Sequence, residues 1–332
     1  MNKRFILNSL VTLLLALATT SAVAWDSVGH RISAAVALEF VSAEVRAELV
    51  GILSAHPRYQ EDFLDSIPRF VNRDDEAQLS RWLLGQAAYW PDIARGLPEP
   101  DREQYNRPSW HYTDGAWVRG SAAFQGNVYI DLEPFADIPG VASAEIREED
   151  QVINVSTAID YNTRILANPN ANPAERAVAL CWVLHLMGDI HQPLHAGALF
   201  SPELFARGDR GGNAVTIDDS NLHSRWDRAL TDGGLEAELA EIMQLLTGFS
   251  RPQIEGVDSD WDQWLNESRM TLLNLVYSPT IRAAIRSAEA SGRELETLSL
   301  DEAYVSSMQQ VARQRLGLAG LRLAIYFSNE LP

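Results

Sequence analysis

The sequence predicts an all-α protein built as one mainly helical domain. Apolar residues recur at helical spacing through most of the chain, which is the pattern of helices that bury one face. Strand-like alternation is scarce, and GNAVTI at 212–217 is the best short candidate. The chain has 332 residues, of which 46% are hydrophobic, so it can bury a large core. We find no internal repeat and no low-complexity tract.

The first 24 residues have the composition of a secretory signal peptide. Lys3 and Arg4 give a basic start, an apolar run follows, and Ala22-Val23-Ala24 is a small-x-small cleavage signal. A membrane anchor is the alternative, but the apolar run is short and no stop-transfer pattern follows it. We therefore expect a mature domain over 25–332 that begins at Trp25 and is secreted or periplasmic, with no membrane span after signal removal.

Helices are expected in order along the mature chain. Residues 29–53 predict one or two helices, with a break near Ser42 and Glu44. A helix over 74–90 should stop at Pro91, and 149–166 is amphipathic. Residues 172–192 begin with a capping asparagine and a proline, and Pro193 should end that helix. The last helical segments are 234–249, 260–277 and 300–331.

Charge and cysteine content exclude some classes of protein. The formal charge is −18, and it becomes −20 once the two basic residues of 1–24 are removed. Such an acidic chain is unsuited to binding duplex nucleic acid through a basic face, although a charged substrate could still bind through metal ions. Cys181 is the only cysteine, so no internal disulfide can form, and its apolar neighbours make it a core residue.

The segment HLMGDIHQPLH, residues 185–195, holds three of the seven histidines. His185 and Asp189 are four residues apart, so on a helix they share a face. His191 lies roughly 200° around the helix from Asp189, so we interpret it as structural or as a support for the ligands. Pro193 breaks the helix and allows His195 to turn back toward that face. Histidine and aspartate are ordinary zinc ligands.

Other short segments offer further ligands. LHSRWD contains a second pair at i and i+4, His223 with Asp227. Three more candidates lie upstream, namely Asp92 in YWPDIAR, His111 in SWHYTD and His30 in WDSVGH. Each has a simpler interpretation, because such a pair is often only a salt bridge and Asp92 could be a helix cap. His56 we interpret as a loop residue without a role. The spacing alone supports a site with His185, Asp189 and His195.

Together these motifs resemble the zinc-dependent single-strand-specific nuclease family of the S1/P1 type. AWDSVGH, WPDIAR, SWHYTD, HLMGDIHQPLH, GDRGGN and LHSRWD occur in the family's order. The resemblance covers nearly all of 25–232 and becomes weak in the last third. It implies the fold that this family shares with bacterial zinc phospholipase C, a single helical domain with long active-site loops.

The resemblance also implies three Zn²⁺ ions. The first would be held by Asp92, His111, His185 and Asp189. The second would be held by His195, His223 and Asp227. The third would be held by His30, Asp189 and Trp25, the last through its free α-amino group and carbonyl oxygen. Asp189 would thus bridge two ions, and signal removal would be needed to create the amine.

The implied activity is hydrolysis of single-stranded DNA and RNA to 5′-nucleotides, with action on 3′-nucleotides as well. Asp92 would orient or deprotonate the attacking water, and Arg95 would contact the transition-state phosphate. Tyr112 would stack on a base, which Asp114 and Asn213 would hydrogen-bond. Without the resemblance, Arg95 is a solvated helix charge, Tyr112 a core aromatic and Asn213 a turn residue.

Two other functions remain open from the sequence. One is a zinc phospholipase C or a phosphomonoesterase on the same scaffold, although phospholipases typically carry Glu at the position of Asp227. The other is a secreted zinc-buffering or adhesion protein, against which the Asp92–Arg95 pair argues. The chain also lacks the disulfide cysteines of eukaryotic family members, which leaves base preference open in the loops of 91–148 and 196–212.

Overall fold

A computed structural model describes residues 25–113, 128–129, 154–201, 203–206, 208–218, 220–247 and 260–331. Within these ranges the protein is mainly helical, which confirms the predicted fold class. The α-helices are α1 (Ser27–Phe40), α2 (Ala43–Leu53), α3 (Glu76–Ala94), α4 (Asp101–Tyr105), α6 (Val155–Ala167), α7 (Pro173–Asp189), α8 (Leu222–Asp227), α9 (Leu235–Leu246), α11 (Trp261–Thr271), α12 (Pro279–Ser291) and α13 (Glu302–Glu330).

Short elements connect these helices. Two are π-helical, η1 (Tyr59–Leu64) and η6 (Leu272–Val276), and three are 3₁₀ turns, η2 (Pro108–His111), η4 (Pro193–His195) and η5 (Thr231–Gly233). The strands form two antiparallel pairs, β1 (Val128–Tyr129) with β2 (Ala198–Leu199) and β3 (Thr216–Ile217) with β4 (Ser220–Asn221). In the described part of the chain no helix is long and apolar enough to cross a membrane.

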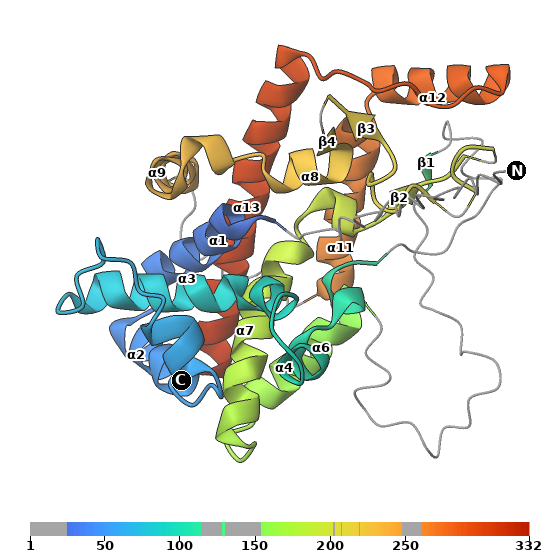
Figure 1. Ribbon diagram of the computed structural model, residues 1–332. Coiled ribbons are helices and arrows are strands. Elements are labelled where there is room, and N and C mark those ends of the chain that lie inside the picture. The colour runs from blue at the N-terminus through green and yellow to red at the C-terminus, as the bar shows by residue number, and fades with distance from the viewer. Residues whose placement is uncertain are drawn as a thin grey trace, which may run out of the picture.

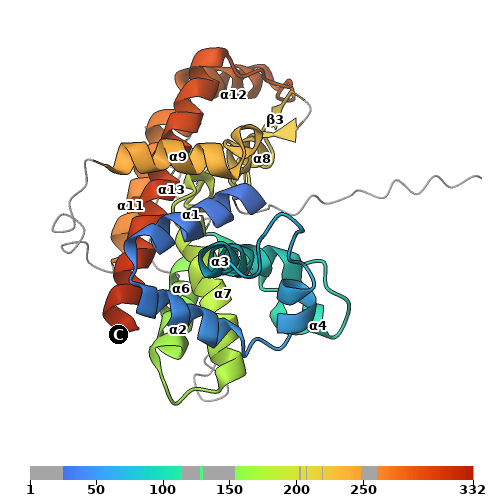
Figure 2. The same ribbon diagram turned by 90° about the vertical axis from the view of Figure 1, so that its left-hand side faces the viewer.

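The long helix α13 runs along the molecule, with α12 joined to its first turn by a loop at one end and the C-terminus near α2 at the other (Figure 1). Helix α1 packs on α13 and on α3, and α3 packs on α7 (Figure 2). Two apolar clusters result, one around α2, α3, α6 and α7 and one around α8, α9, α12 and the first half of α13. Helix α1 contributes to both, with Leu38 in the first and Val36 in the second.

Helix α7 is the most enclosed of the helices that matter for the site. Asn172 caps it by accepting a hydrogen bond from the backbone N–H of Ala174, and Pro173 occupies its first position, as the sequence predicts. From Val183 to Asp189 every residue is buried, so the helix is surrounded by other elements on all sides. This packing fixes the direction of the polar side chains that α7 carries among its apolar neighbours.

Two predicted helix ends are wrong. Pro91 lies inside α3, which continues to Ala94. It costs one backbone hydrogen bond near the C-terminal end, and the helix completes a single further turn after it. Helix α7 ends at Asp189, four residues before Pro193. The carbonyls of the two residues after the helix, Ile190 and His191, accept hydrogen bonds from Ser268 and Arg315 of the C-terminal third.

Two further expectations need correction. The predicted strand over 212–217 is reduced to Thr216–Ile217, because the glycines before it adopt left-handed turn conformations. Helix α12 is absent from the sequence-based prediction, although Ser278 caps it and Pro279 occupies its first turn, which are ordinary start signals. The expected break near Ser42 is present, and Ser42 is the N-cap of α2.

Candidate metal centre

Eight of the predicted ligand side chains converge on the C-terminal end of α7. They come from six separate elements, so only the folded chain brings them together: His30 from α1, Asp92 from α3, His111 from η2, His185 and Asp189 from α7, His195 from η4, and His223 and Asp227 from α8. Each of them is at most 8% exposed. These residues form three groups whose ligand atoms lie within 4.8 Å of one another.

The first group contains His111, His185 and Asp189. The Oδ2 atom of Asp189 lies 3.1 Å from Nε2 of His185 and 3.1 Å from Nδ1 of His111. The two histidine nitrogens are 2.8 Å apart. His185 donates its Nδ1 proton to the carbonyl of Ala88 at 2.8 Å, so in the neutral ring the lone pair of Nε2 points into the group. The three donor atoms therefore face one point.

The second group contains His195, His223 and Asp227. His195 donates Nδ1–H to the carbonyl of His111 at 2.7 Å, and His223 donates Nδ1–H to that of Gly211 at 2.6 Å. Their Nε2 atoms then face each other with lone pairs at 3.2 Å, and His223 Nε2 lies 3.4 Å from Oδ2 of Asp227. Two zinc ligands at about 2.0–2.1 Å from a tetrahedral ion would be separated by about 3.3 Å.

The third group contains His30, Asp92 and His185. The rings of His30 and His185 stack with centroids 3.8 Å apart. Nε2 of His30 also lies 3.6 Å from Oδ1 of Asp189, whose other oxygen belongs to the first group. The two oxygens of Asp189 thus face different histidines, as a bridging carboxylate requires. The sequence assigned Asp92 to the first ion, and the structure places it beside His30 as well.

Trp25 lies against the ligand-bearing turn of α7. Its side chain is 1% exposed, and its indole Nε1 donates to the carbonyl of Gly188 at 3.0 Å. The next residue, Asp26, donates its backbone N–H to the carbonyl of Asp227 at 3.2 Å. A Cβ atom on Gly188 would lie 2.9 Å from Nδ1 of His30, so only glycine admits the histidine at this distance. The chain at Trp25 therefore lies between two ligand-bearing elements.

The loop GDRGGN positions the second group from outside. Gly211 has φ = 59° and a Cβ there would lie 2.4 Å from the carbonyl oxygen of Leu194, so this position requires glycine. Asp209, fully buried, accepts from the backbone N–H of Leu199 and from the hydroxyl of Tyr277 at 2.7 Å. The result is a fixed carbonyl at Gly211 for His223. Tyr277 has no motif around it that could have identified it from the sequence.

Burial is the largest influence on the pKa values of the aspartates and of His185 in the candidate centre. It raises the pKa of Asp92 and Asp227, and it raises that of Asp189 to about 6 although His185 acts in the opposite direction. Burial also acts to lower the pKa of His185, but the charge and hydrogen bond of Asp189 bring it above its usual value. Carboxylates and imidazoles that are this buried are costly as isolated charges, and a cation among them removes that cost.

The donor set fits zinc. At the candidate centre, several buried atoms make no hydrogen bond within the described structure, including both ring nitrogens of His30, Oδ2 of Asp92, Oδ1 of Asp189 and Oδ2 of Asp227. Buried polar atoms are rarely left in this way. Imidazole nitrogens combined with a few carboxylates are typical zinc ligands, whereas magnesium and calcium prefer sites made of oxygen.

The predicted catalytic and base-binding residues lie in different environments. Nη2 of Arg95 is 3.0 Å from Oδ1 of Asp92, and the arginine side chain is only 18% exposed, so it is not a solvated helix charge. Tyr112 is half-buried directly after His111. Asn213 donates Nδ2–H to the carbonyl of Arg210 at 2.8 Å, as a turn residue would. Asp114 lies outside the described residues.

The two remaining histidines are buried and lie in none of the three groups. His56 is in a loop, as expected, but it packs against Trp90 with ring centroids 4.3 Å apart. His191 donates Nδ1–H to the carbonyl of Met187 and accepts from Arg322. Gln192, which the sequence analysis did not select, donates to Oδ1 of Asp227 at 2.6 Å. Its position between two ligands of one motif was the available signal.

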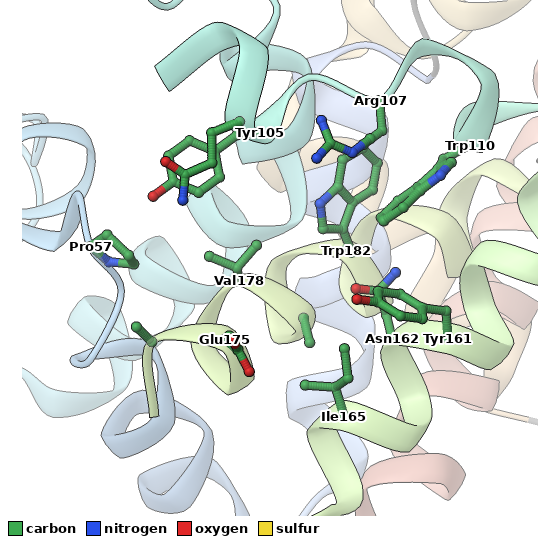
Figure 3. Close-up of a pocket in the computed structure, with 13 residues that line it drawn as sticks. Pro57, Tyr105, Arg107, Trp110, Tyr161, Asn162, Ile165, Glu175, Val178 and Trp182 are labelled. Atoms are coloured by element: carbon green, nitrogen blue, oxygen red, sulfur yellow. The ribbon is translucent and has the colours of Figure 1, made fainter. Parts of the chain in front are cut away.

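A cavity of about 290 Å³ lies between α4, α6 and the first half of α7 (Figure 3). Its aromatic lining includes Trp110 and Trp182, whose rings pack edge to face with centroids 4.8 Å apart. Trp182 also contacts His111, with centroids 5.4 Å apart. None of the predicted ligands lines the cavity, so we interpret its aromatic wall as the support that holds His111 against α7.

Comparison with known proteins gives a consistent result. The S1/P1 nuclease family matches residues 25–331. Endonuclease 5 of Arabidopsis thaliana is 31% identical over 153 residues, which are 44% of this chain and 48% of that protein. Endonuclease 3 of the same plant is 24% identical over 282 residues, or 81% and 82% of the two chains. Nuclease S1 of Aspergillus oryzae is 28% identical over 193 residues, or 52% and 60%. The match thus spans about half the length of Endonuclease 5.

Proposed function

Because the chain belongs to the S1/P1 nuclease family, we propose that it is a zinc-dependent phosphodiesterase that hydrolyses single-stranded DNA and RNA to 5′-nucleotides. We propose 3′-nucleotides as further substrates. The observation that carries the proposal is the convergence of three buried His/Asp groups on one end of α7, in a chain with so few histidines. The relatives named as nucleases and endonucleases support the choice of nucleic acid over phospholipid.

Three zinc ions would be held by the residues that the sequence assigned. Asp189 would be shared, since its two oxygens face different histidines. Trp25 would complete the third set through its α-amino group once residues 1–24 are removed, and that removal also implies a secreted or periplasmic protein. Three zinc ions and three aspartates would leave about three positive charges in the site, which would attract a phosphate to a protein that is acidic overall.

Zinc in such a site would acidify a bound water and offset the charge on a phosphodiester. Asp92 would hold the attacking water through a hydrogen bond and take up its proton as a general base. Arg95, fixed by its ion pair with Asp92, would donate to a phosphate oxygen on the side from which the water attacks. The carbonyls of Ala88, His111 and Gly211 would keep three imidazoles in the required tautomer.

Selection of single strands would come from base stacking beside the ligands. Tyr112 follows His111 directly, and an aromatic ring there could accept an unpaired base with roughly 1–3 kcal/mol of stacking energy. A base in a duplex is already stacked and paired, so it would not be available. Asp114 and Asn213 would hydrogen-bond the base edge. Since one Nδ2–H of Asn213 is donated to the carbonyl of Arg210, this residue would contact the base through its other amide hydrogen or its Oδ1 atom.

A hydrolysis panel tests this function. The mature protein is incubated with single-stranded DNA, RNA, duplex DNA, 3′-AMP and phosphatidylcholine, and the products are identified. We expect 5′-nucleotides from both single strands, phosphate from 3′-AMP, and much slower cleavage of the duplex. Hydrolysis of phosphatidylcholine alone would assign the chain to phospholipid chemistry. Tight zinc binding without turnover of any substrate would favour zinc buffering.

A further inference from the structure

The C-terminal third carries a buried cluster of charges directly behind the ligand-bearing turn of α7. Arg322 from α13 makes a bidentate pair with Glu267 from α11, with Nη2 to Oε1 at 2.7 Å and Nη1 to Oε2 at 2.8 Å. Arg315, also from α13, reaches Oε2 of the same carboxylate at 2.9 Å. Both arginine side chains are 7% exposed. Two buried cations therefore share one partly exposed anion, and further acceptors are needed.

Those acceptors belong to the turn between two predicted ligands, Asp189 and His195. Nη1 of Arg322 donates to Nε2 of His191 at 2.7 Å, and Nε of Arg315 donates to the carbonyl of His191 at 3.2 Å. The ring of His191 is oriented for this, because its Nδ1–H is donated to the carbonyl of Met187. A guanidinium can only donate, so the Nε2 atom of His191 accepts in its bond with Arg322.

Two side chains of α11 hold the same turn at its two ends. The hydroxyl of Ser268 donates to the carbonyl of Ile190 at 2.5 Å and accepts from Nη2 of Arg315 at 2.7 Å. Nε of Arg269 donates to the carbonyl of Ala196 at 3.0 Å. Carbonyls at a helix C-terminus have no partner within the helix, and positive charge is favourable there. The cluster supplies both the partners and the charge.

From this arrangement we propose that Arg322 and Arg315 are positioning residues for the zinc ligands. Through His191 they fix the turn that carries Asp189 into the bridging position and returns His195 to the second group. The inference rests on the proposed function, since it assumes that these residues bind zinc. It assigns a role to residues of the C-terminal third, where none of the ligand motifs lies, and to the one histidine of HLMGDIHQPLH that is not a candidate ligand.

Positioning of this kind should be measurable as metal retention. Residues that orient metal ligands from behind usually change metal affinity by about 10–100-fold when they are removed. We therefore expect Arg322→Met to release zinc to a chromogenic chelator about 10–100-fold faster than the unaltered mature protein. Arg322→Lys keeps the charge and one donor, so it should recover much of the slow release. Both measurements use the zinc-loaded protein without substrate.

Arg313→Met is the matched control. Arg313 lies on the same helix and is paired with Glu238 at 2.6 Å, so its loss also removes an ion pair from α13. Within the described residues its side-chain hydrogen bonds go to Glu238 and not to the ligand turn, so zinc release should stay at the rate of the unaltered protein. If Arg322→Met proves unable to fold, His191→Phe removes the acceptor of Arg322, together with the Nδ1–H bond to Met187, and keeps the Arg322–Glu267 pair, and the same acceleration is expected.

The outcomes separate this inference from the proposed function. The positioning role alone would be overturned if the unaltered protein binds zinc and Arg322→Met, His191→Phe and Arg313→Met all release it at the rate of the unaltered protein. The melting temperatures of the variants do not change this conclusion. An unaltered mature protein that binds no zinc would overturn the proposed function, and the positioning role with it. Faster release from the first two variants, with partial rescue by lysine, supports the proposal.

Discussion

The indole Nε1 of Trp25 donates a hydrogen bond to the carbonyl of Gly188 at 3.0 Å. This bond joins the residue at the expected start of the mature chain to the residue just before Asp189, the proposed bridging ligand. It also leaves the backbone of Trp25 beside the carbonyl of Asp227, which accepts from the next N–H in the chain. Trp25, the expected start of the mature chain, is therefore built into the candidate centre, and the chemistry of its α-amino group can be altered without changing any ligand side chain.

A residue left in front of Trp25 should weaken the centre. The extension turns the α-amino group into an amide, which is a far poorer zinc ligand than a neutral amine. We expect a protein with an uncleaved Met before Trp25 to bind less zinc and to lose about 10–100-fold in activity. Helical content should be unchanged, because α1 is capped by Asp26 and packed on α3 and α13. Circular dichroism, metal analysis and a nuclease assay on the two samples measure this.

Proteolytic removal of the extension is the control, and it should restore zinc and activity together. Equal zinc content and equal rates in the extended and the cleaved protein would show that Trp25 acts only as a buried aromatic residue.

Replacing Asp92 should abolish turnover and leave the fold intact. In Asp92→Asn the amide keeps the size of the side chain but cannot take up a proton, and it loses the charge that pairs with Arg95. Loss of a general base typically lowers the rate by about 10²–10⁴-fold. The rate on single-stranded DNA and the circular dichroism spectrum are the readouts. Near-normal rates with normal zinc content would remove Asp92 from the proposed mechanism.

Chelation should inactivate the protein reversibly. Stripping zinc leaves three buried aspartates without their cations, and we expect activity to vanish and then return when zinc is added. Magnesium alone should not restore it, because six of the nine proposed ligands are nitrogen donors and magnesium prefers oxygen. The measurement is the nuclease rate after chelation and after each addition. Full recovery with magnesium would contradict the proposed donor set.

His56 should make stability depend on pH in a way that is independent of the metal ligands. Burial lowers its pKa from 6.5 to about 4, with Asp62 raising it and Arg58 lowering it further. The folded state therefore binds fewer protons than the unfolded state, so stability is full above pH 6.5 and falls as the pH drops from there toward 4. Between pH 7.5 and 5 we expect this histidine to cost about 2 kcal/mol of unfolding free energy.

His56→Asn tests that pH dependence. Asparagine can accept the hydrogen bond that Nδ1 takes from the backbone N–H of Arg58 at 3.1 Å, but it does not titrate. Denaturant unfolding of both proteins at pH 7.5 and pH 5 gives the comparison. The variant should lose less stability than the unaltered protein over this interval, and equal losses would show that His56 titrates normally.

Many of the helices could be predicted from the sequence because helical periodicity and capping residues agree along the chain. Ser42 and Asn172 cap α2 and α7 where the sequence indicates. The end of α7 could not be predicted in the same way, since the carbonyls just after it are bonded by Ser268 and Arg315, which are far away in sequence. The helix end predicted at Pro91 is wrong for a related reason. Helix α3 packs against α1 and α7, and it tolerates a proline near its C-terminal end.

In the candidate site, too, the sequence predicted local pairs of residues but not the contacts between distant segments. The i and i+4 spacing placed His185 with Asp189 and His223 with Asp227, and both pairs are within 3.5 Å in the structure. Spacing could not bring His30 onto His185, because that contact depends on the packing of α1 on α7 and on the glycine at 188. Nor could it identify Arg322 or Tyr277, whose partners are far away in sequence.

The zinc content of the mature, active protein tests the central claim most directly. The protein that begins at Trp25 is purified without chelators, shown to hydrolyse single-stranded DNA, and analysed for zinc per chain on the same sample. The account predicts three zinc ions per chain, held by the eight buried histidine and aspartate side chains at the end of α7 together with Trp25. One zinc ion per chain in a fully active sample would contradict it.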